Sequence, residues 1–433
     1  MSKQEDGGVG VLGTWQRWPL YLRIVGGMIL GVAVGLLLGP KAQSLAIPSK
    51  LVLRLLGALA PALILVAIVK ALMEASFEKG TAGRLVRLLA LNTLVAICVG
   101  LAVANVLKPG SWSADLKPLG GDAHKHGAGQ PDILQQFLDN VPQSILGPLT
   151  DNGKVIGVIF LALAFGVALK KHADRPLRNV KDAIDLALDA LVAILHWIID
   201  VVPFAVFGLV ASIVGTQGFA PFQALGAFIL AVLLALLVQA SYYLLRVKLG
   251  SWVQPSKLIA GCRDALVMAF STGSSTVTMP VTYECLHQRV GLREKSASLG
   301  AFVGANFNND GTALYEAMAA LFVSQLLAAQ GAGEALTLTQ QILVVLTSVI
   351  ASVGAAGIPE AGLVTMTLVF NAVNLPTEYI ALLLPVDWFL DRCRTVINVM
   401  GDMNVSCMID GTTQEQRAVA ASPIDPANAG APA

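Results

Sequence analysis

Residues 304–318, GANFNNDGTALYEAM, place three asparagines, an aspartate and a glutamate between the apolar runs at 296–302 and 319–329. Without this stretch, the whole region would be expected to form one long hydrophobic helix. Asn, Asp and Gly compete with helical hydrogen bonding, so we expect the helix to unwind here. The freed carbonyls and the Asn and Asp oxygens are hard ligands that suit a dehydrated alkali cation. The stretch therefore predicts a cation-binding break in an apolar helix.

The composition is that of an integral membrane protein. Charged residues make up 13% of the 433 residues and hydrophobic residues 55%, whereas charged residues are roughly a quarter of an average soluble domain. Several apolar runs have the ~20-residue length that a tilted helix needs to cross the hydrocarbon core. The strongest runs are 21–39, 51–72, 85–107, 155–169 and 224–245. The net charge of +1 gives no indication of nucleic-acid binding.

The distribution of Lys and Arg predicts which loops face the cytoplasm, because these residues concentrate in short cytoplasmic loops. Basic residues follow the runs that end near 72, 169 and 245, whereas segments 211–223 and 321–343 contain none and are expected outside. Residues 1–18 carry Glu5 and Asp6 in place of the basic start of a signal peptide and are interpreted as a cytoplasmic tail. The Ala/Pro-rich residues 412–433 are predicted to be a disordered cytoplasmic tail.

Two segments of the C-terminal half have the pattern of re-entrant hairpins. In 264–286 a polar centre lies between apolar ends, with basic residues on both flanks, and in 340–376 a small-residue tip lies between two apolar arms. Non-helical backbone at membrane depth is tolerated only where protein or a water-filled cavity covers it. Two opposed hairpins therefore predict a central binding site of the kind found in transporters. The alternative is that each segment is an ordinary crossing kinked by Gly and Pro.

The last apolar span, 381–409, carries polar residues on one face. At about 100° per residue these positions fall within an arc of roughly 100°; they are Asp387, Asp391, Arg394, Thr395, Asn398 and Asp402. Each ionised group at the bilayer centre costs at least ~2.5 kcal/mol on insertion scales, so this face must look into protein, water or ligand. A structural ladder of ion pairs is the alternative, but three carboxylates outnumber the one arginine on this face. The excess negative charge predicts bound cations or a ligand ammonium.

Two other polar segments carry weaker signals. The linker 109–132 is too polar to enter the bilayer, and its His124 and His126 are interpreted as part of a solvated loop, with a metal site as the alternative. The segment 179–215 begins with polar residues that indicate an interfacial helix face or, alternatively, a polar track: Asp182, Asp185, Asp189 and His196.

Four motifs, in this order, resemble the dicarboxylate/amino acid:cation symporter family, which includes the excitatory amino acid transporters of animals. They are STGSSTVTMPVT at 271–282, NNDGTALYEA at 308–317, GAAGIPEAGLVTM at 354–366 and VDWFLDRCRTVINVMGD at 386–402. The resemblance runs from about residue 17 to residue 411. It implies an all-α membrane protein with eight transmembrane helices and two re-entrant helical hairpins. It also implies a homotrimer in which a mobile transport domain carries substrate past a static scaffold by an elevator movement.

The domain boundaries expected from this resemblance divide the chain into a scaffold and a transport domain. Scaffold helices are expected in 19–75, and scaffold or trimerisation helices in 133–215. A transport-domain helix is expected at 82–108. The remaining transport domain, 221–411, would consist of a helix, the hairpin 264–286, the broken helix 297–328, the hairpin 340–376 and the last helix 381–409.

The resemblance also implies roles for individual residues. Arg394 would hold the side-chain carboxylate of an acidic substrate, which suits its planar bidentate chemistry, and Asp391 would take the substrate ammonium. Further substrate contacts would come from Thr395, Asn398, Ser274, Ser275, Thr312, Ile358 and Gly362. One sodium site would comprise Asp402, Asn398, Asn308 and the carbonyl of Gly304. A second would comprise Asp310, Asn308, Thr93 and Asn92, and a third Ser352, Val353, Ala355 and Asn306.

Glu316 is a candidate for proton coupling. Together with Gly273 and Arg392, it resembles the animal-type branch of the family rather than the archaeal one. Desolvation favours the neutral form of a buried carboxyl, so Glu316 could carry a proton with the substrate. The alternative is a structural pair with Arg392 or Arg394.

Three departures from the family pattern leave the number of coupled sodium ions open. Asn309 stands where the family usually has a methionine between the ion and substrate sites. Asn306 stands where a threonine is common. Leu89 stands where a tyrosine often closes the third cation site.

We therefore expect a secondary active symporter, not an enzyme, that takes up glutamate or aspartate together with sodium. Protons are a further candidate for the coupled ion. Asp391 favours an amino acid, because a plain dicarboxylate has no ammonium to meet it. The alternative is a proton-coupled C4-dicarboxylate symporter with Asp391 protonated. An intramembrane protease would need a nucleophile with a base or a matched aspartate dyad, and an ion channel one pore-lining stripe, and neither pattern is found. The expected location is the inner cell membrane.

Overall fold

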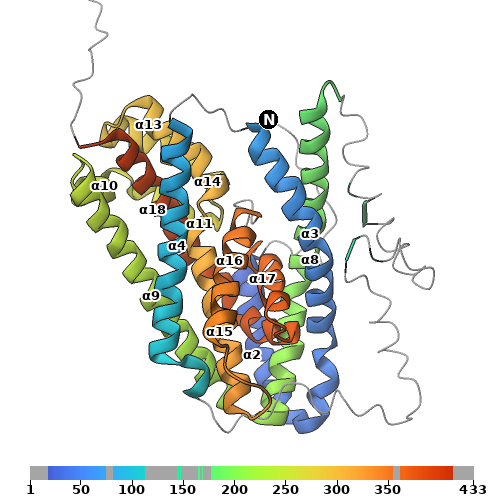
Figure 1. The fold of residues 1–433 in the computed structure, drawn as a ribbon. Coiled ribbons are helices and arrows are strands. Elements are labelled where there is room, and N and C mark those ends of the chain that lie inside the picture. The colour runs from blue at the N-terminus through green and yellow to red at the C-terminus, as the bar shows by residue number, and fades with distance from the viewer. Residues whose placement is uncertain are drawn as a thin grey trace, which may run out of the picture.

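The computed structural model describes residues 18–74, 81–112, 144–145, 147, 164–165, 168, 177–354 and 361–412. The expected tails, most of the polar linker and its His124 and His126 lie outside these residues. The described part is helical (Figure 1). Its α-helices are α2 (Leu20–Leu38), α3 (Ile47–Glu74), α4 (Thr81–Leu107), α8 (Val180–Gln217), α9 (Ala220–Gly250), α10 (Pro255–Gly261), α11 (Arg263–Thr272), α12 (Ser275–Glu284), α13 (Glu294–Ser298), α14 (Gly304–Phe307), α15 (Asp310–Ala329), α16 (Leu338–Gly354), α17 (Ala361–Ala372) and α18 (Leu384–Asp410). Tighter or wider helical turns are η1 (Gly39–Ala46), η2 (Pro109–Trp112), η3 (Cys285–Val290), η4 (Leu299–Val303) and η5 (Thr377–Leu383).

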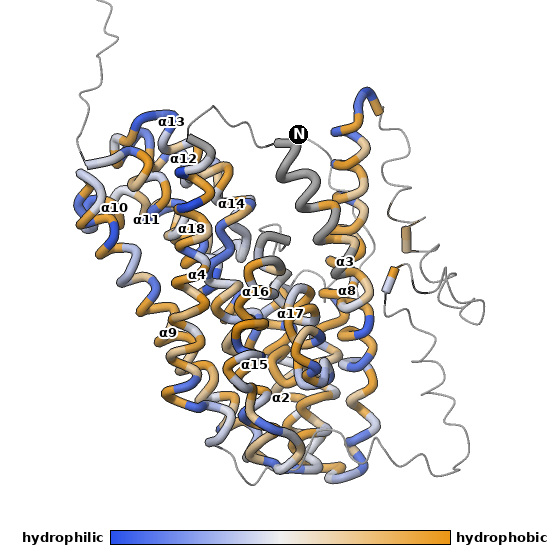
Figure 2. The backbone as a smooth tube through the Cα atoms, in the orientation of Figure 1, coloured by the Kyte–Doolittle hydropathy of each residue, from blue (hydrophilic) through white to orange (hydrophobic). Residues whose placement is uncertain are grey.

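Five helical segments within the described residues are long and apolar enough to cross a membrane. They are Leu20–Leu59, Gly83–Trp112, Val180–Gln217, Pro221–Gly250 and Glu294–Ala329. Apolar residues dominate the middle of the bundle, and hydrophilic residues gather towards its two ends (Figure 2). This distribution is what a bilayer requires of a helical membrane protein.

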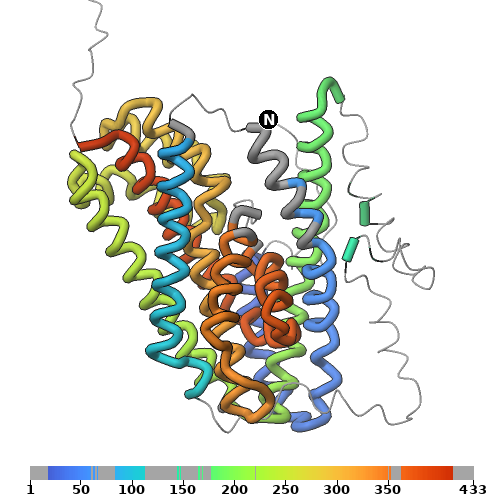
Figure 3. The backbone as a smooth tube through the Cα atoms, viewed as in Figure 1, coloured from blue at the N-terminus to red at the C-terminus, as the bar shows by residue number. Residues whose placement is uncertain are grey.

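Helices α2, α3 and α8 form one packed group. Both α2 and α3 lie against α8, although α8 is far from them in sequence (Figure 3). Gly31 brings α2 close to α8, because a Cβ at this position would lie 2.6 Å from the Phe207 carbonyl oxygen. Gly27 and Gly35, one turn to either side, make the same kind of approach. This spacing of small residues is the usual way for two membrane helices to pack closely.

Substituting Gly31 by alanine should therefore destabilise the protein. The added methyl group meets backbone rather than a flexible side chain, so the helices must separate, and overpacking of this kind costs about 1–3 kcal/mol. Thermal unfolding in detergent would measure the effect. The matched control is Gly26→Ala on the same helix, because a Cβ at Gly26 meets nothing within 4 Å. Equal stability of the two variants would contradict the packing argument.

Helix α15 is the central element of a second group. Nearly every side chain along it is buried, and it packs against α4, α9, α16, α17 and α18 (Figure 1). A helix that is hydrophobic all round is expected to lie inside a bundle. The polar face of α18 packs against α15, so the polar residues of α18 are enclosed by protein.

Three interruptions surround α15 and α18. The chain reverses between α11 and α12 at Gly273, whose φ of +64° lies in the left-handed region, and Ser274 caps α12 by accepting a hydrogen bond from the Val277 amide at 3.2 Å. Helices α16 and α17 pack against each other, with the residues between them, 355–360, outside the described part. The helix formed by α14 and α15 breaks at Asn308 and Asn309.

Candidate functional site

The polar face of α18 is buried along its length. Its exposed fractions run from 0% for Arg394 to 6% for Asp391; the other members are Asp387, Thr395, Asn398 and Asp402. Helix α18 makes this possible because its polar positions fall on one side, where α11, α14 and α15 cover them. The face therefore looks into protein.

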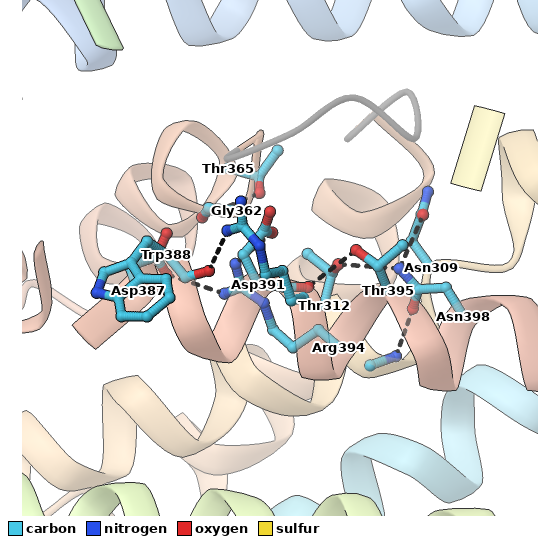
Figure 4. A network of polar contacts seen from close by, with 12 residues as sticks. Asn309, Thr312, Gly362, Thr365, Asp387, Trp388, Asp391, Arg394, Thr395 and Asn398 are labelled. Carbon is cyan, nitrogen blue, oxygen red and sulfur yellow. Dashed lines mark hydrogen bonds and ion pairs between the residues drawn. The ribbon is translucent and has the colours of Figure 1, made fainter. Parts of the chain in front are cut away.

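Arg394 is the centre of a buried charge cluster. Its Nη2 lies 2.7 Å from Oδ1 of Asp391, and its Nη1 lies 3.2 Å from Oδ1 of Asp387 (Figure 4). Its guanidinium carbon lies 4.0 Å from the centre of the Tyr315 ring, in a cation–π contact. Within the described residues, Nε and Nη1 have no hydrogen-bond partner. The guanidinium thus keeps Nε without a partner, whereas Nη1 takes part in the ion pair with Asp387.

Arg394 contacts both nearby carboxylates, so the ion pairs considered as the structural alternative for α18 are present. These ion pairs do not balance the negative charge of the cluster. Two ionised carboxylates against one guanidinium leave the cluster with one excess negative charge, which a ligand ammonium would neutralise.

Gly362, at the start of α17, lies over the guanidinium. A Cβ at this position would lie 3.1 Å from Nη1 and 3.2 Å from Nη2 of Arg394. The start of α17 thus contributes a backbone surface to the arginine cluster. Ile358 and Ala355 lie outside the described residues, and the Val353 side chain is also not described.

A network of amides joins the helix break to α18. The Asn398 Oδ1 accepts a hydrogen bond from the Gly311 amide at 2.8 Å, and its Nδ2 donates to Asn309 Oδ1 at 3.3 Å and to Thr312 Oγ1 at 3.4 Å (Figure 4). Asn309 in turn donates to the Ser352 carbonyl at 2.9 Å. The break, the last helix and the arm of the second hairpin therefore meet at these side chains.

The first predicted cation site keeps acceptors that lack donors. Oδ1 of Asp402 and Oδ1 of Asn308 are buried and have no hydrogen-bond partner within the described residues. Gly304 allows the close approach, because a Cβ there would lie 2.4 Å from Asp402 Oδ1. Buried oxygens without donors are costly unless something else satisfies them. These residues fit a cation that is bound as cargo.

The second predicted cation site is supplied with donors by the protein. Thr93 Oγ1 donates to Oδ1 of Asp310 at 2.6 Å, and the Tyr243 hydroxyl donates to Oδ2 of the same carboxylate. Arg246 donates through Nη1 to the amide oxygen of Asn92. Tyr243 and Arg246 both come from α9. The Asp310 and Asn92 oxygens of this site are therefore engaged, whereas Asn308, which the two predicted sites share, keeps its Oδ1 without a partner within the described residues.

The remaining predicted site residues are placed around these clusters. Asn306 is half-buried and donates to the Phe302 carbonyl of its own helix at 3.0 Å, so it does not join Ser352. Ser275 donates to the Ala305 carbonyl at 3.2 Å and ties α12 to α14. Thr395 donates to the Asp391 carbonyl at 2.8 Å.

Glu316 is fully buried on α15 and accepts a hydrogen bond from the Thr365 hydroxyl of α17. Its other carboxylate oxygen has no hydrogen-bond partner within the described residues. Arg392 instead donates to the Trp388 carbonyl at 2.6 Å. Glu316 is thus held by a hydroxyl beside the Arg394 cluster.

Four residues of these clusters were not identified from the sequence. Tyr315 and Thr365 lie inside quoted motifs, and their positions beside Arg394 and Glu316 could have marked them. Tyr243 and Arg246 lie on an apolar span, and only their spacing of three residues, which places both on one helix face, could have suggested a shared role.

Comparisons with known proteins identify the family of the chain. The model of the sodium:dicarboxylate symporter family matches residues 20–412. The chain belongs to this family. It is 36% identical over 293 residues to excitatory amino acid transporter 4 of Mus musculus, covering 65% of this chain and 50% of the mouse protein. It is 31% identical over 461 aligned positions to the putative sodium-dependent excitatory amino acid transporter glt-4 of Caenorhabditis elegans, covering 90% and 89% of the two chains.

The chain also resembles excitatory amino acid transporter 1 of Homo sapiens, with 35% identity over 282 residues, or 62% of this chain and 48% of the human protein. The matched region thus spans about half the length of the mouse and human relatives. Membership of the sodium:dicarboxylate symporter family explains the apolar helices, and the protein is a multi-pass membrane protein.

Proposed function

We propose that this protein is a secondary active symporter that takes up glutamate or aspartate coupled to sodium. The observation that carries the proposal is the buried Arg394, which has an open donor at Nε and lies beside Asp391. A zwitterionic amino acid with a side-chain carboxylate matches this pair. The printed names of the relatives, which are excitatory amino acid transporters, support the same substrate class.

Substrate binding would rearrange the pairing of Arg394. The substrate's side-chain carboxylate would bind an edge of the guanidinium, whose Nε has no hydrogen-bond partner within the described residues, and a planar bidentate pairing would strengthen the contact. The substrate ammonium then approaches Asp391, which is released in part from the guanidinium, while Asp387 remains as the counter-charge. Asn398, Thr312 and the backbone near Gly362 and Ser275 provide the remaining polar contacts.

The same proposal includes the architecture expected for the family. It consists of eight transmembrane helices and two re-entrant hairpins, a homotrimer, and an elevator movement of the transport domain in the cell membrane. The packing of α2 and α3 on α8, and of α4, α9, α16, α17 and α18 on α15, supports a scaffold and a transport domain. The hairpins at α11–α12 and α16–α17, which border the α18 face, support gates on opposite sides.

Sodium would bind as cargo at Asp402, Asn308, Asn398 and the Gly304 carbonyl. The acceptors without donors at Asp402 and Asn308 support this choice. Bound cations would neutralise the Asp402 carboxylate, which lies one turn beyond Asn398 on α18. Cation and substrate would then share Asn398, which couples the two binding events.

Uphill accumulation in proteoliposomes tests the proposal. Purified protein should concentrate labelled L-aspartate or L-glutamate against its gradient when an inward sodium gradient is imposed, and stop when the gradient is abolished. Accumulation of succinate driven by a proton gradient alone, without amino acid uptake, would favour the proton-coupled C4-dicarboxylate symporter. Uptake of neither substrate under either gradient would contradict both functions.

Glu316→Gln should remove any coupling to protons. Glu316 can carry a proton, whereas glutamine accepts the Thr365 hydrogen bond but cannot titrate. Wild-type uptake is expected to increase when the inside is made alkaline at a constant sodium gradient, and uptake by the variant should not respond. Thr365→Val is the matched control, because it removes the hydroxyl but keeps the acid. An unchanged proton response in Glu316→Gln would remove Glu316 from the coupling.

A further inference from the structure

We propose that Arg246 is a fixed cation that takes the place of a transported sodium ion at the Asp310 site. The inference rests on the proposed function and sets how many cations that function uses. The carrier would then couple transport to one sodium ion fewer than the three predicted sites allow.

The hydrogen bonds at this site carry the inference. A sodium ion at the predicted site would need lone pairs from Asp310 and Asn92. In the structure, each carboxylate oxygen of Asp310 accepts from a hydroxyl, one from Thr93 and one from Tyr243. The Asn92 oxygen accepts from the Arg246 guanidinium. Of the oxygens predicted to bind the ion, those of Asp310 and Asn92 are thus engaged by donors of the protein itself, whereas Oδ1 of Asn308, which both predicted sites share, has no partner within the described residues.

Arg246 also brings a fixed positive charge to the site through its hydrogen bond to Asn92. Asp310 is 0% exposed, and a buried carboxylate needs a counter-charge or good hydrogen bonds. The carboxylate also lies in the first turn of α15, where the helix dipole favours negative charge. A sodium ion placed beside Arg246 would instead meet a like charge in a poorly hydrated environment.

The predicted cation site at Asp402, on α18, differs from the Asp310 site in its hydrogen bonds. Oδ1 of Asp402 and Oδ1 of Asn308 have no hydrogen-bond partner within the described residues. The two predicted cation sites therefore differ in one physical respect, which is whether the protein supplies its own positive charge and hydrogen-bond donors. We expect sodium at Asp402 and none at Asp310.

An ordinary role for Arg246 would be that of a basic residue at the cytoplasmic end of α9, because Lys and Arg concentrate at such helix ends. That role requires only that the guanidinium reach water or headgroups. Arg246 instead is half-buried and turns to Asn92 on α4, with the Tyr242 ring 5.9 Å from its guanidinium carbon. Arg246 and Tyr243, three residues apart, thus engage two of the four predicted ligands of one site, Asn92 and Asp310.

The test compares the sodium dependence of L-aspartate binding in wild type, Arg246→Met and Arg246→Lys. Binding is measured on purified protein in detergent by the shift in thermal unfolding, so no transport is required. Arg246→Met frees the Asn92 oxygen and leaves Asp310 without its cation. A sodium ion should then bind there. For each tenfold rise in sodium concentration, the gain in aspartate affinity should be about 10-fold larger in Arg246→Met than in wild type. Arg246→Lys keeps the charge and should behave as wild type.

An identical sodium dependence in wild type and Arg246→Met would overturn the fixed cation while leaving the proposed function intact. Asp310→Asn gives a second test if Arg246→Met does not fold. With a fixed cation, this change leaves the sodium dependence as in wild type. If, for each tenfold rise in sodium concentration, the gain in aspartate affinity is about 10-fold smaller in Asp310→Asn than in wild type, a sodium ion binds at Asp310 and the inference is overturned. The absence of any sodium effect, in wild type as well, would contradict both the inference and the sodium coupling.

Discussion

Arg394→Cys should abolish uptake and binding of glutamate and aspartate. The guanidinium is fully buried and is the cation that the substrate's side-chain carboxylate would contact. Truncating one partner of a buried, hydrogen-bonded charge pair costs about 2–5 kcal/mol, which corresponds to a loss of affinity of about 30-fold to several thousand-fold. The smaller, uncharged cysteine leaves space where the guanidinium lay, so neutral amino acids such as serine or cysteine should bind in place of acidic ones.

Arg392→Cys is the matched control for this experiment. Arg392 is two positions away on the same helix and donates to the Trp388 carbonyl, and it is not part of the proposed substrate contact. Labelled uptake and thermal-shift binding should be measured for both variants with acidic and neutral amino acids. Binding of a neutral amino acid by Arg394→Cys would show that the variant folds. Undiminished aspartate binding by it would remove Arg394 from the site.

Asp391→Asn should weaken aspartate binding and spare dicarboxylates. Asn keeps the shape and hydrogen-bonding capacity of Asp391 but removes the charge that the substrate ammonium would meet. Hydrogen bonds to charged groups contribute about 1.5–3 kcal/mol, so aspartate affinity should fall by about 10- to 150-fold. Succinate, which has two carboxylates and no ammonium, should not lose affinity. The ratio of aspartate to succinate affinity, measured by competition, is the readout.

Asp387→Asn separates the ammonium contact from a general effect on Arg394. Asp387 pairs with the same guanidinium at 3.2 Å and is not proposed to contact the ammonium. Its substitution should therefore change aspartate and succinate affinities by similar factors. The proposed role of Asp391 fails if Asp391→Asn also lowers both affinities equally.

The sequence predicted features that depend on local composition. The break at Asn308 and Asn309 follows from residues that compete with helical hydrogen bonds, and the structure interrupts the helix there. The one-sided polar face of α18 follows from helical periodicity, and the structure buries it. The reversal at Gly273 lies in the polar centre of the predicted hairpin 264–286.

Contacts between distant helices could not be predicted in the same way. The Arg246 interaction with Asn92 joins residues 154 positions apart, and nothing local to α9 distinguishes Arg246 from a basic residue at a cytoplasmic helix end. The Thr365 hydroxyl meets Glu316 only because α17 packs against α15. The sequence argument also discounted the ion-pair ladder because it counted charges on the whole face. The structure shows that Arg394 contacts two carboxylates at once.

An experimental structure with L-aspartate and sodium bound tests the central claim most directly. We predict that the substrate's side-chain carboxylate lies within hydrogen-bond distance of the Arg394 guanidinium and its ammonium within hydrogen-bond distance of Asp391, with a sodium ion at Asp402. A substrate found elsewhere, with Arg394 still paired to both Asp387 and Asp391, would contradict the account.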